Sequence, residues 1–258
     1  VLNHCYMSGY AEMVRGNKPV IYESHNVEAL LKERLYENNR TGQSLIAKTR
    51  ELEMNALKMA DYVTCVSDRD LQEFKKTTKL DESNSAVAPN GVDCSALEPI
   101  DYEKRSELRR KFGLGTETTC VFLGSGHPPN AEAVRFLLED VAPENNRVTF
   151  LIVGSVCGWF HSVSIPENVV LMGILDERIK DTILTHSDIA LNPLFTGSGS
   201  SLKVPEYLRA GLPILSTKTG ARGFDQLPDS GMDIVDREEF SDTLKKLDQD
   251  FERRIKMA

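Results

Sequence analysis

Two charged residues, Lys203 and Glu206, stand three positions apart just after the glycine and serine loop Gly197-Ser198-Gly199-Ser200-Ser201. The pattern from Leu202 to Ala210 predicts a short helix, and residues three apart lie on one helix face. Backbone N–H groups at a helix start lack partners within the helix and, with the helix dipole, favour an anion such as phosphate. Lysine can hold a diphosphate while glutamate accepts hydroxyl hydrogens. These residues therefore predict a site for a phosphate ligand.

The same features have a purely structural interpretation, which the residue types alone leave open. A glycine and serine loop before a helix is also an ordinary capping turn. Lys203 and Glu206 can also pair with each other along a solvated helix, a contact worth about 0.2–0.5 kcal/mol in isolation. The helix is expected to end at Gly211, since glycine with a proline soon after is a common helix stop.

Charge and composition narrow the classes of protein that fit. A formal charge of −8 and a pI near 5.3 argue against nucleic acid as the main partner, but a local group of N–H donors still binds phosphate on an acidic protein. The five cysteines are scattered without a C-x-x-C pair, which fits reduced thiols in a cytoplasmic protein better than disulfides or a zinc site. No apolar run approaches the ~18 residues of a membrane span.

The ends of the chain and one basic patch bear on its extent and location. The chain begins at Val1 and ends in a helix-like run from Phe240 to Ala258, so we expect a fragment truncated at its N-terminus. The patch from Lys75 to Lys79 leaves open a contact with the anionic inner face of a membrane, although a solvated helix end is the simpler interpretation.

Strands and helices alternate along the chain. Strands are expected at 20–23, 61–66, 85–88, 119–123, 148–153, 169–172, 188–192 and 212–217. A break at 38–42 is expected between two helices, and Ser67 is expected to cap a third. This alternation predicts an α/β fold with parallel sheets. The polar stretch at 94–117 indicates a join, so we expect two domains, at residues 1–100 and 101–258.

Glycines follow several of the expected strands. Gly124, Gly154 and Gly173 each come directly after one, and Gly197 lies in the loop after another. Ligands of open parallel sheets bind beyond the carboxyl ends of the strands. The four glycines on one edge therefore predict a crevice.

An ordered set of motifs resembles one large family, the retaining, nucleotide-sugar-dependent glycosyltransferases of the group 1 type. The match covers about residues 20 to 250. Its pieces are His25-Asn26-Val27-Glu28, Glu53 with 60–67, Pro89-Asn90-Gly91-Val92-Asp93, Gly124-Ser125, Pro129-Asn130, the stretch from Gly197 through Lys203 to Glu206, Gly211-Leu212-Pro213 and Gly220-Ala221-Arg222-Gly223. The resemblance implies the GT-B fold, two facing Rossmann-like domains, of which the N-terminal, acceptor-side domain is incomplete here and the C-terminal one binds the donor.

The resemblance also implies roles for single residues. Glu206 matches the second glutamate of the family's E-x7-E motif, which binds the ribose, and Lys203 would lie near the diphosphate. His25 would contact the donor sugar or its phosphate, but a structural histidine is an equal alternative. The remaining donor-binding residues, by backbone contacts to the phosphates, sugar or base, would be Gly124, Ser125, Gly173, Leu175, Gly197, Ser198, Gly199, Ser200, Ser201 and Leu202.

Two departures from the family pattern stand out. Ser198 replaces the first glutamate of E-x7-E, which usually contacts the transferred sugar. The loop after Ser125 reads Gly126-His127-Pro128-Pro129 and lacks the cations that relatives often carry there, so phosphate neutralisation would depend more on Lys203.

The sequence therefore predicts a retaining glycosyltransferase that moves a sugar from a nucleotide diphosphate donor to a saccharide or lipid-linked acceptor, as in polysaccharide biosynthesis. Because the chain shows no metal-ligand cluster, we expect a metal-independent reaction without a cofactor. A nucleotide-sugar-binding module without catalysis is the alternative, motivated by Ser198 and the missing N-terminal half. A dinucleotide oxidoreductase is disfavoured, because no G-x-G-x-x-G follows a strand with an acidic residue ~20 positions on.

Overall fold

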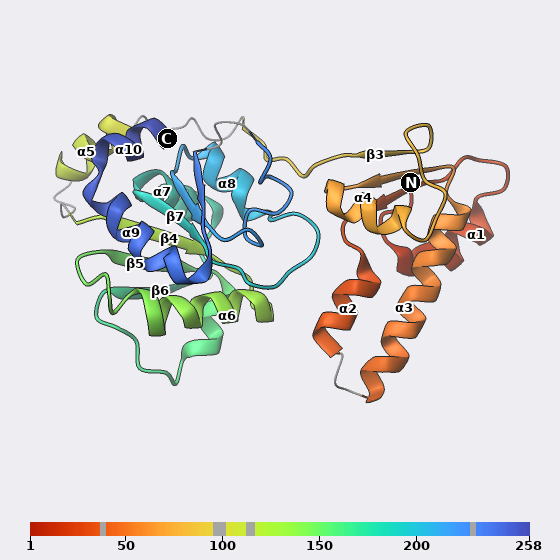
Figure 1. The fold of residues 1–258 in the computed structure, drawn as a ribbon, viewed down its shortest axis with the longest axis horizontal. Helices are drawn as coiled ribbons and strands as arrows, with labels where there is room; N and C mark the ends of the chain where they lie inside the picture. Colours follow the sequence, from red (N-terminus) through yellow and green to blue (C-terminus); the bar gives the residue numbers. More distant parts are fainter. Residues whose placement is uncertain (37–39, 95–101, 112–116, 228–230) are drawn as a thin grey trace. The chain divides into compact units, whose positions relative to one another are not determined.

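The computed structural model describes residues 1–36, 40–94, 102–111, 117–227 and 231–258. The chain forms two compact units (Figure 1). Unit 1 comprises Val1–Asn90 together with Gly197–Ser200, and unit 2 comprises Gly91–Thr196 with Ser201–Ala258. The boundary expected near residue 100 falls in 95–101, outside the described residues.

Unit 1 has a small parallel sheet with helices packed against it. Its elements are the 3₁₀ turn η1 (Cys5–Met7), α1 (Ser8–Val14), β1 (Ile21–Ser24), α2 (Glu28–Tyr36), α3 (Arg40–Met59), β2 (Tyr62–Cys65), α4 (Asp68–Lys75) and β3 (Ser85–Val87). Within the described residues the strands are ordered β1-β2-β3, with Ile21 beside Tyr62 and Val63 beside Ser85. The apolar core joins Tyr22 and Val63 of the sheet to Leu57 of α3 and Phe74 of α4.

The helix α3 begins earlier than the sequence predicts. Residues 38 and 39 of the expected break lie outside the described part of the chain, but Arg40, Thr41 and Gly42 are helical. Gly42 and Ile46 are both buried, so packing of this end of the helix outweighs the low helix propensity of glycine. The prediction of a turn at 40–42 was wrong.

Unit 2 is the larger α/β layer structure. Its elements are α5 (Tyr102–Lys111), β4 (Thr119–Leu123), α6 (Pro128–Phe136), the π-helical turn η2 (Leu137–Val141), β5 (Thr149–Val153), η3 (Ser155–Phe160), β6 (Val169–Gly173), α7 (Glu177–His186), β7 (Ile189–Asn192), α8 (Lys203–Arg209), β8 (Ile214–Ser216), β9 (Met232–Ile234), η4 (Arg237–Glu239), α9 (Phe240–Gln249) and α10 (Phe251–Met257). Over the described residues its parallel sheet has the order β6-β5-β4-β7-β8-β9.

Each face of this sheet is covered by helices. Phe122, Phe150 and Ile152 pack with residues of α6 and α9 on one face. On the other face Val121, Ala190 and Ile214 pack with residues of α7 and α8. Strands buried on both faces read as continuous apolar runs, as β7 does. Both units are therefore α/β with parallel sheets, as the sequence predicts.

Two helix ends match their predicted signals. The Ser67 side chain accepts a hydrogen bond from the backbone N–H of Asp70 at the start of α4, as expected for a cap. After α8, Gly211 has a φ of 63°, the left-handed conformation that ends helices. Strand β9, at Met232–Ile234, was not predicted; it is a short edge strand that lacks a long apolar run.

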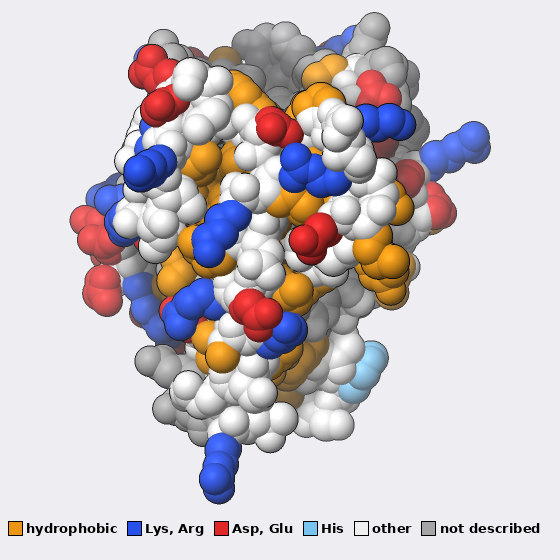
Figure 2. Space-filling view, turned by 90° about the vertical axis from the view of Figure 1, so that its right-hand side faces the viewer, with side chains coloured by type: hydrophobic (Ala, Val, Ile, Leu, Met, Phe, Trp, Pro, Cys, Tyr) orange, Lys and Arg blue, Asp and Glu red, His pale blue; other side chains and the backbone are white. Residues whose placement is uncertain are grey.

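Helix α1 carries apolar side chains toward solvent. Tyr10 is 66% exposed, and Met13 and Val14 are exposed even more. This helix lies on the side of the molecule that faces the viewer in Figure 2, where apolar side chains alternate with charged ones. Among the described residues, no helix combines the length and the apolar character that crossing a membrane requires.

Candidate active site

The strand order of unit 2 places a binding site at one position. The chain runs outward from β4 through β5 to β6 and then returns to β7 on the other side of β4. At such a reversal the loops after the two central strands diverge and leave a crevice at the carboxyl edge of the sheet. The loops in question follow Leu123 of β4 and Asn192 of β7. Gly124 and Ser125 lie directly after the first, and α8 follows the second.

A hydrogen-bonded chain links the two sides of this switch point. Lys203 Nζ donates to Asn130 Oδ1 at 2.9 Å. Asn130 Nδ2 in turn donates to the carbonyl of Ser125 at 3.1 Å and approaches its hydroxyl at 3.2 Å. Two predicted site residues, Ser125 and Lys203, are thus brought together by Asn130, to which the sequence assigned no role.

Lys203 is half-buried and forms no ion pair with an acidic side chain among the described residues. Its ammonium lies 4.0 Å from the centre of the Phe122 ring. Burial lowers the pKa of Lys203 well below its usual value, Arg222 lowers it further, and Glu206 opposes the shift. A cation in these surroundings is poorly compensated by the protein, so the site favours an anionic ligand.

Glu206 does not pair with Lys203, so the structural interpretation of these two residues as an i, i+3 pair was wrong. Its Oε2 lies 2.8 Å from Nζ of Lys180, which projects from α7. Lys180 also contacts Glu177 Oε2 at 2.8 Å. Burial lowers the pKa of Lys180, but hydrogen bonds to Glu177 and Glu206 outweigh it, and the net shift is upward.

The start of α8 is held by a buried polar group. Asn192 Nδ2 donates to the Ser201 hydroxyl at 3.0 Å and to the Gly220 carbonyl at 2.7 Å. The Ser201 N–H donates to the carbonyl of Arg222 at 3.1 Å, so this amide is occupied. Leu202, the next residue, is 63% exposed. Ser201 therefore anchors the helix start, and its predicted contact with the donor would have to come from its hydroxyl.

The buried Tyr207 fixes the orientation of α8 against the sheet. Its hydroxyl accepts a hydrogen bond from the N–H of Leu123 at 2.8 Å and donates to the carbonyl of Leu191 at 3.3 Å. These two residues belong to β4 and β7, the strands at the switch point. One phenol thus sets the position of Lys203 and Glu206 relative to both strand ends.

The glycines at this edge allow adjacent loops to approach closely. Gly154 has a φ of 112°, and a Cβ there would lie 2.1 Å from the Gly124 carbonyl oxygen. The N–H of Gly124 donates to Val153 and that of Gly154 to Gly173, which joins three of the predicted loops in one row. Leu175 packs partly against the apolar core. The contacts expected of Gly173 and Leu175 with the base stay predictions.

In unit 1 the loop Gly197–Ser200 lies against the residues that follow β1. The Ser198 hydroxyl donates to Asn26 Oδ1 at 3.1 Å. Gly199 has a φ of 63°, and a Cβ there would lie 2.5 Å from the carbonyl oxygen of His25, so only glycine fits. The structure thus brings His25, Ser198 and Gly199 together. The His25 side chain is exposed.

The rest of this loop leaves backbone donors available. The Ser200 hydroxyl accepts a hydrogen bond from Asn90 Nδ2 at 2.6 Å, which ties it to the predicted turn at Pro89-Asn90. Within the described part of the chain, the N–H groups of Gly199, Ser200 and Leu202 have no acceptor. Such donors suit phosphate oxygens, as the sequence predicts, while the roles of Gly197 and the other loop residues stay predictions.

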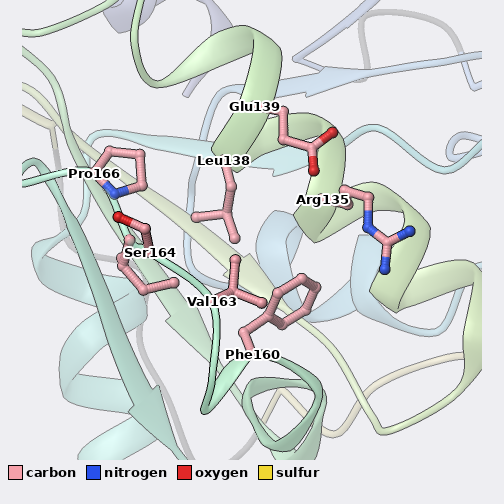
Figure 3. Close-up of a pocket in the computed structure, with 8 residues that line it drawn as sticks. Arg135, Leu138, Glu139, Phe160, Val163, Ser164 and Pro166 are labelled. Carbon is pink, nitrogen blue, oxygen red and sulfur yellow. The ribbon is translucent and has the colours of Figure 1, made fainter.

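A cavity elsewhere in unit 2 is separate from these residues. It has a volume of about 390 Å³ and lies between Leu138 and Glu139 of η2 and the segment from Phe160 to Pro166 (Figure 3). Phe160 and Val163 contribute apolar surface, with Arg135 and Glu139 at its edge. None of the predicted site residues lines it. In the described ranges, no cluster of three or more His, Cys, Asp or Glu side chains could hold a metal ion.

Three site residues received no role from the sequence: Lys180, Asn192, and Asn130, which was named only as part of a family motif. Lys180 lies in the middle of an ordinary amphipathic helix and gives no local signal. Asn192 is the polar last residue of an apolar strand at the switch point, and this position could have identified it as a site residue. Asn130 stands beside proline at a helix start, where capping is the usual explanation.

Parallel sheets covered by helices, with a candidate site at the switch point of unit 2, define an α/β protein of the kind that binds ligands at the carboxyl ends of its strands. The family model "Glycosyl transferases group 1" matches residues 117–250, and "Glycosyltransferase Family 4" matches residues 1–96. The chain belongs to the group 1 glycosyltransferases.

Solved structures agree with this assignment at the level of the fold. HepE from Anabaena in complex with UDP-glucose has a TM-score of 0.71 at 14% identity, over 98% of this chain and 68% of that one. WaaG, a glycosyltransferase involved in lipopolysaccharide biosynthesis, has a TM-score of 0.66 at 15% identity, and the match covers 93% of this chain and 69% of WaaG. Sucrose-phosphate synthase from Thermosynechococcus elongatus has a TM-score of 0.76 at 14% identity, and the match covers 99% of this chain and 65% of that one. Curated protein sequences gave no match.

Proposed function

We propose that this chain binds a nucleotide diphosphate sugar and transfers the sugar, with retention of configuration, to a saccharide or lipid-linked acceptor. The observation that carries the proposal is the half-buried ammonium of Lys203, which is joined through Asn130 to Ser125, lies over the Phe122 ring and has no ion-pair partner among the described residues. A diphosphate would supply the missing negative charge. The structure of HepE contains UDP-glucose, which supports UDP-sugars as the first donors to test.

The proposed reaction breaks the bond between the anomeric carbon and the oxygen of the terminal phosphate. The acceptor hydroxyl oxygen forms the new bond on the same face of the sugar, and its proton passes to the departing phosphate. Lys203 stabilises the negative charge that develops on the diphosphate. Glu206 accepts a hydrogen bond from the ribose. His25 is assigned to the donor sugar or its phosphate on the basis of family resemblance alone.

A donor screen tests the binding step. The melting temperature is measured with saturating UDP-, GDP- and ADP-sugars. A donor at ~100 times its dissociation constant adds about 2.7 kcal/mol to the free energy of unfolding. Lys203→Met should reduce the shift strongly at the same donor concentration, whereas Lys245→Met, a change at an exposed lysine of α9, should keep it. If no sugar nucleotide moves the melting temperature of the wild type, the proposal fails.

A transfer assay tests the reaction and its stereochemistry. Product formed from the best donor and a panel of saccharide and lipid-linked acceptors is followed by NMR of the anomeric proton. The configuration at the anomeric carbon should be that of the donor. Because we propose a reaction without a metal or cofactor, the rate should be the same after treatment with EDTA. An inverted product or a requirement for added metal would contradict these parts of the proposal.

A binding module without catalysis is a second candidate. The observation in its favour is Ser198, which replaces the sugar-contacting glutamate of the family and donates its hydroxyl hydrogen to Asn26. In that case the donor shifts the melting temperature while neither hydrolysis nor transfer is detected. Ser198→Glu then distinguishes a lost catalytic group from a site that never had one, since it would restore transfer only in the first case.

A further inference from the structure

Helices α7 and α8 are joined by two ion pairs within unit 2. Lys180 Nζ lies 2.8 Å from Glu206 Oε2, and Asp181 Oδ1 lies 2.6 Å from Arg209 Nη2. The Asp181–Arg209 pair involves no residue of the predicted site. The Lys180–Glu206 pair involves Glu206, one of the two charged residues from which that site was predicted.

The two oxygens of Glu206 lie in different surroundings. Oε2 is buried and lies against Lys180, although the side chain as a whole keeps 27% of its surface exposed. Oε1 is not buried and has no hydrogen-bond donor among the residues that the structure describes. The carboxylate therefore offers one open oxygen, where a free carboxylate would offer two.

We propose that Lys180 is a positioning residue that holds Glu206 away from Lys203, so that Glu206 presents one carboxylate oxygen to a single ribose hydroxyl while Lys203 remains available for the diphosphate. This inference rests on the proposed function. It makes Lys180 a determinant of sugar specificity in the nucleoside, through a residue that it contacts.

The consequence of losing Lys180 follows from the helix geometry. Glu206 stands three residues after Lys203, within reach of its ammonium once Lys180 no longer holds it. Lys203 is half-buried and forms no ion pair with another acidic side chain among the described residues, so the two charges would attract each other. That pair would withdraw the carboxylate from the ribose and neutralise the cation intended for phosphate.

Two features of the structure make the idea testable with folded protein. The Asp181–Arg209 pair still joins α7 to α8 when Lys180 is changed. Glu177, the other partner of Lys180, is 81% exposed and does not contact Glu206, which makes Glu177→Gln a matched control. Lys180→Arg keeps a cation of similar reach.

The test measures the affinities of UDP, GDP and ADP and of their 2′-deoxy and 3′-deoxy forms by calorimetry. For the nucleotide that the wild type prefers, one deoxy form should bind about tenfold or more weakly, as expected when a charged acceptor loses its donor. In Lys180→Gln this ratio should fall to about one and the parent nucleotide should bind more weakly. Glu177→Gln and Lys180→Arg should keep the wild-type ratio.

The outcomes separate the inference from the proposed function. If the wild type binds none of the nucleotides, the proposed function fails and the role of Lys180 fails with it. If the wild type binds but does not distinguish the deoxy forms, or if Lys180→Gln keeps the wild-type ratio, only the role of Lys180 is overturned. Circular dichroism and melting temperature confirm that each variant is folded.

Discussion

Two carboxylates, Glu53 in unit 1 and Glu206 in unit 2, are held in contrasting ways. Glu53 is 4% exposed and accepts hydrogen bonds from the N–H groups of Glu28 at 2.6 Å and Ala29 at 3.4 Å, at the start of α2. No cation contacts it in the described part of the chain. Burial raises its pKa to about 7 against those hydrogen bonds, and the negative charges of Glu28 and Asp70 add to the shift. Glu206 instead forms an ion pair with Lys180, whose ammonium nitrogen lies 2.8 Å from Oε2.

The difference shows what each arrangement suits. A carboxylate held by backbone amides fixes the chain, and Glu53 thereby anchors the loop that carries His25 and Asn26. It is a poor anion for a ligand, because it is buried and easily protonated. The carboxylate of Glu206, paired with a lysine on one side, keeps its other oxygen in reach of solvent. Glu53 therefore fits a structural role, and Glu206 fits the ribose contact that we propose.

The largest expected effect concerns Glu53 and is a change in the free energy of unfolding with pH. Its folded-state pKa of about 7 lies above the ordinary 4.5, so its contribution to stability is fully present below pH 4.5 and is lost as the pH rises through 7. A shift of this size corresponds to about 3 kcal/mol. Urea unfolding from pH 4 to 8 should show this loss in the wild type and a flatter profile in Glu53→Gln. An unchanged profile in the variant would contradict the assignment.

Lys203→Met should act in opposite directions on stability and on binding. The free protein should melt at a higher temperature, because an ammonium that is desolvated and has no carboxylate partner among the described residues is replaced by an apolar side chain. The binding free energy of the donor should weaken by about 2 kcal/mol, the range for a hydrogen bond to a charged group. Calorimetry and thermal melts measure both. If Lys203→Met were less stable than the wild type and still bound the donor with wild-type affinity, Lys203 would not be a cation that binds the donor's phosphates.

Tyr207→Phe tests how far the site depends on the anchoring of α8. The change leaves the N–H of Leu123 and the carbonyl of Leu191 without their partner, in a buried position. The expected loss is about 1–2 kcal/mol in the free energy of unfolding. Tyr10→Phe, at an exposed tyrosine, is the control and should change little. Equal effects of the two substitutions would show that the phenol is not an anchor.

The smallest effect is proton uptake on donor binding. Burial lowers the pKa of Lys203 in the free protein, and a bound diphosphate would raise it again, so binding should take up part of a proton. Affinity should therefore weaken as the pH rises. Calorimetry of UDP binding in two buffers with different ionisation enthalpies measures the uptake. Lys203→Met should show none, and a wild type without uptake would mean that Lys203 is already charged.

The sequence was most informative where a local pattern decides the structure. The apolar run of β4, the serine cap of α4 and the glycine after α8 each reflect neighbours within a few residues, and all three predictions were confirmed. The glycine and serine loop and the family motifs located the candidate site for the same reason.

Contacts between distant segments could not be obtained in this way. The spacing of Lys203 and Glu206 left an ion pair between them open as an alternative, but their partners in the structure are Asn130 and Lys180, 73 and 26 positions away respectively. Both of these partners come from helices whose placement depends on how the chain crosses the sheet. Tertiary packing therefore outweighed the pairing that the i, i+3 spacing on the helix allows.

Asn130 can join Lys203 to Ser125 only while its side chain is an amide. One end of the side chain accepts from Lys203 and the other donates to Ser125. Hydrolysis of this amide to aspartate, a spontaneous form of protein ageing, exchanges an NH₂ group for an oxygen and adds a negative charge. The new carboxylate would repel the Ser125 carbonyl and form an internal counter-ion for Lys203. An aged molecule would thus keep its fold while its own side chain occupied the place of the substrate's phosphate.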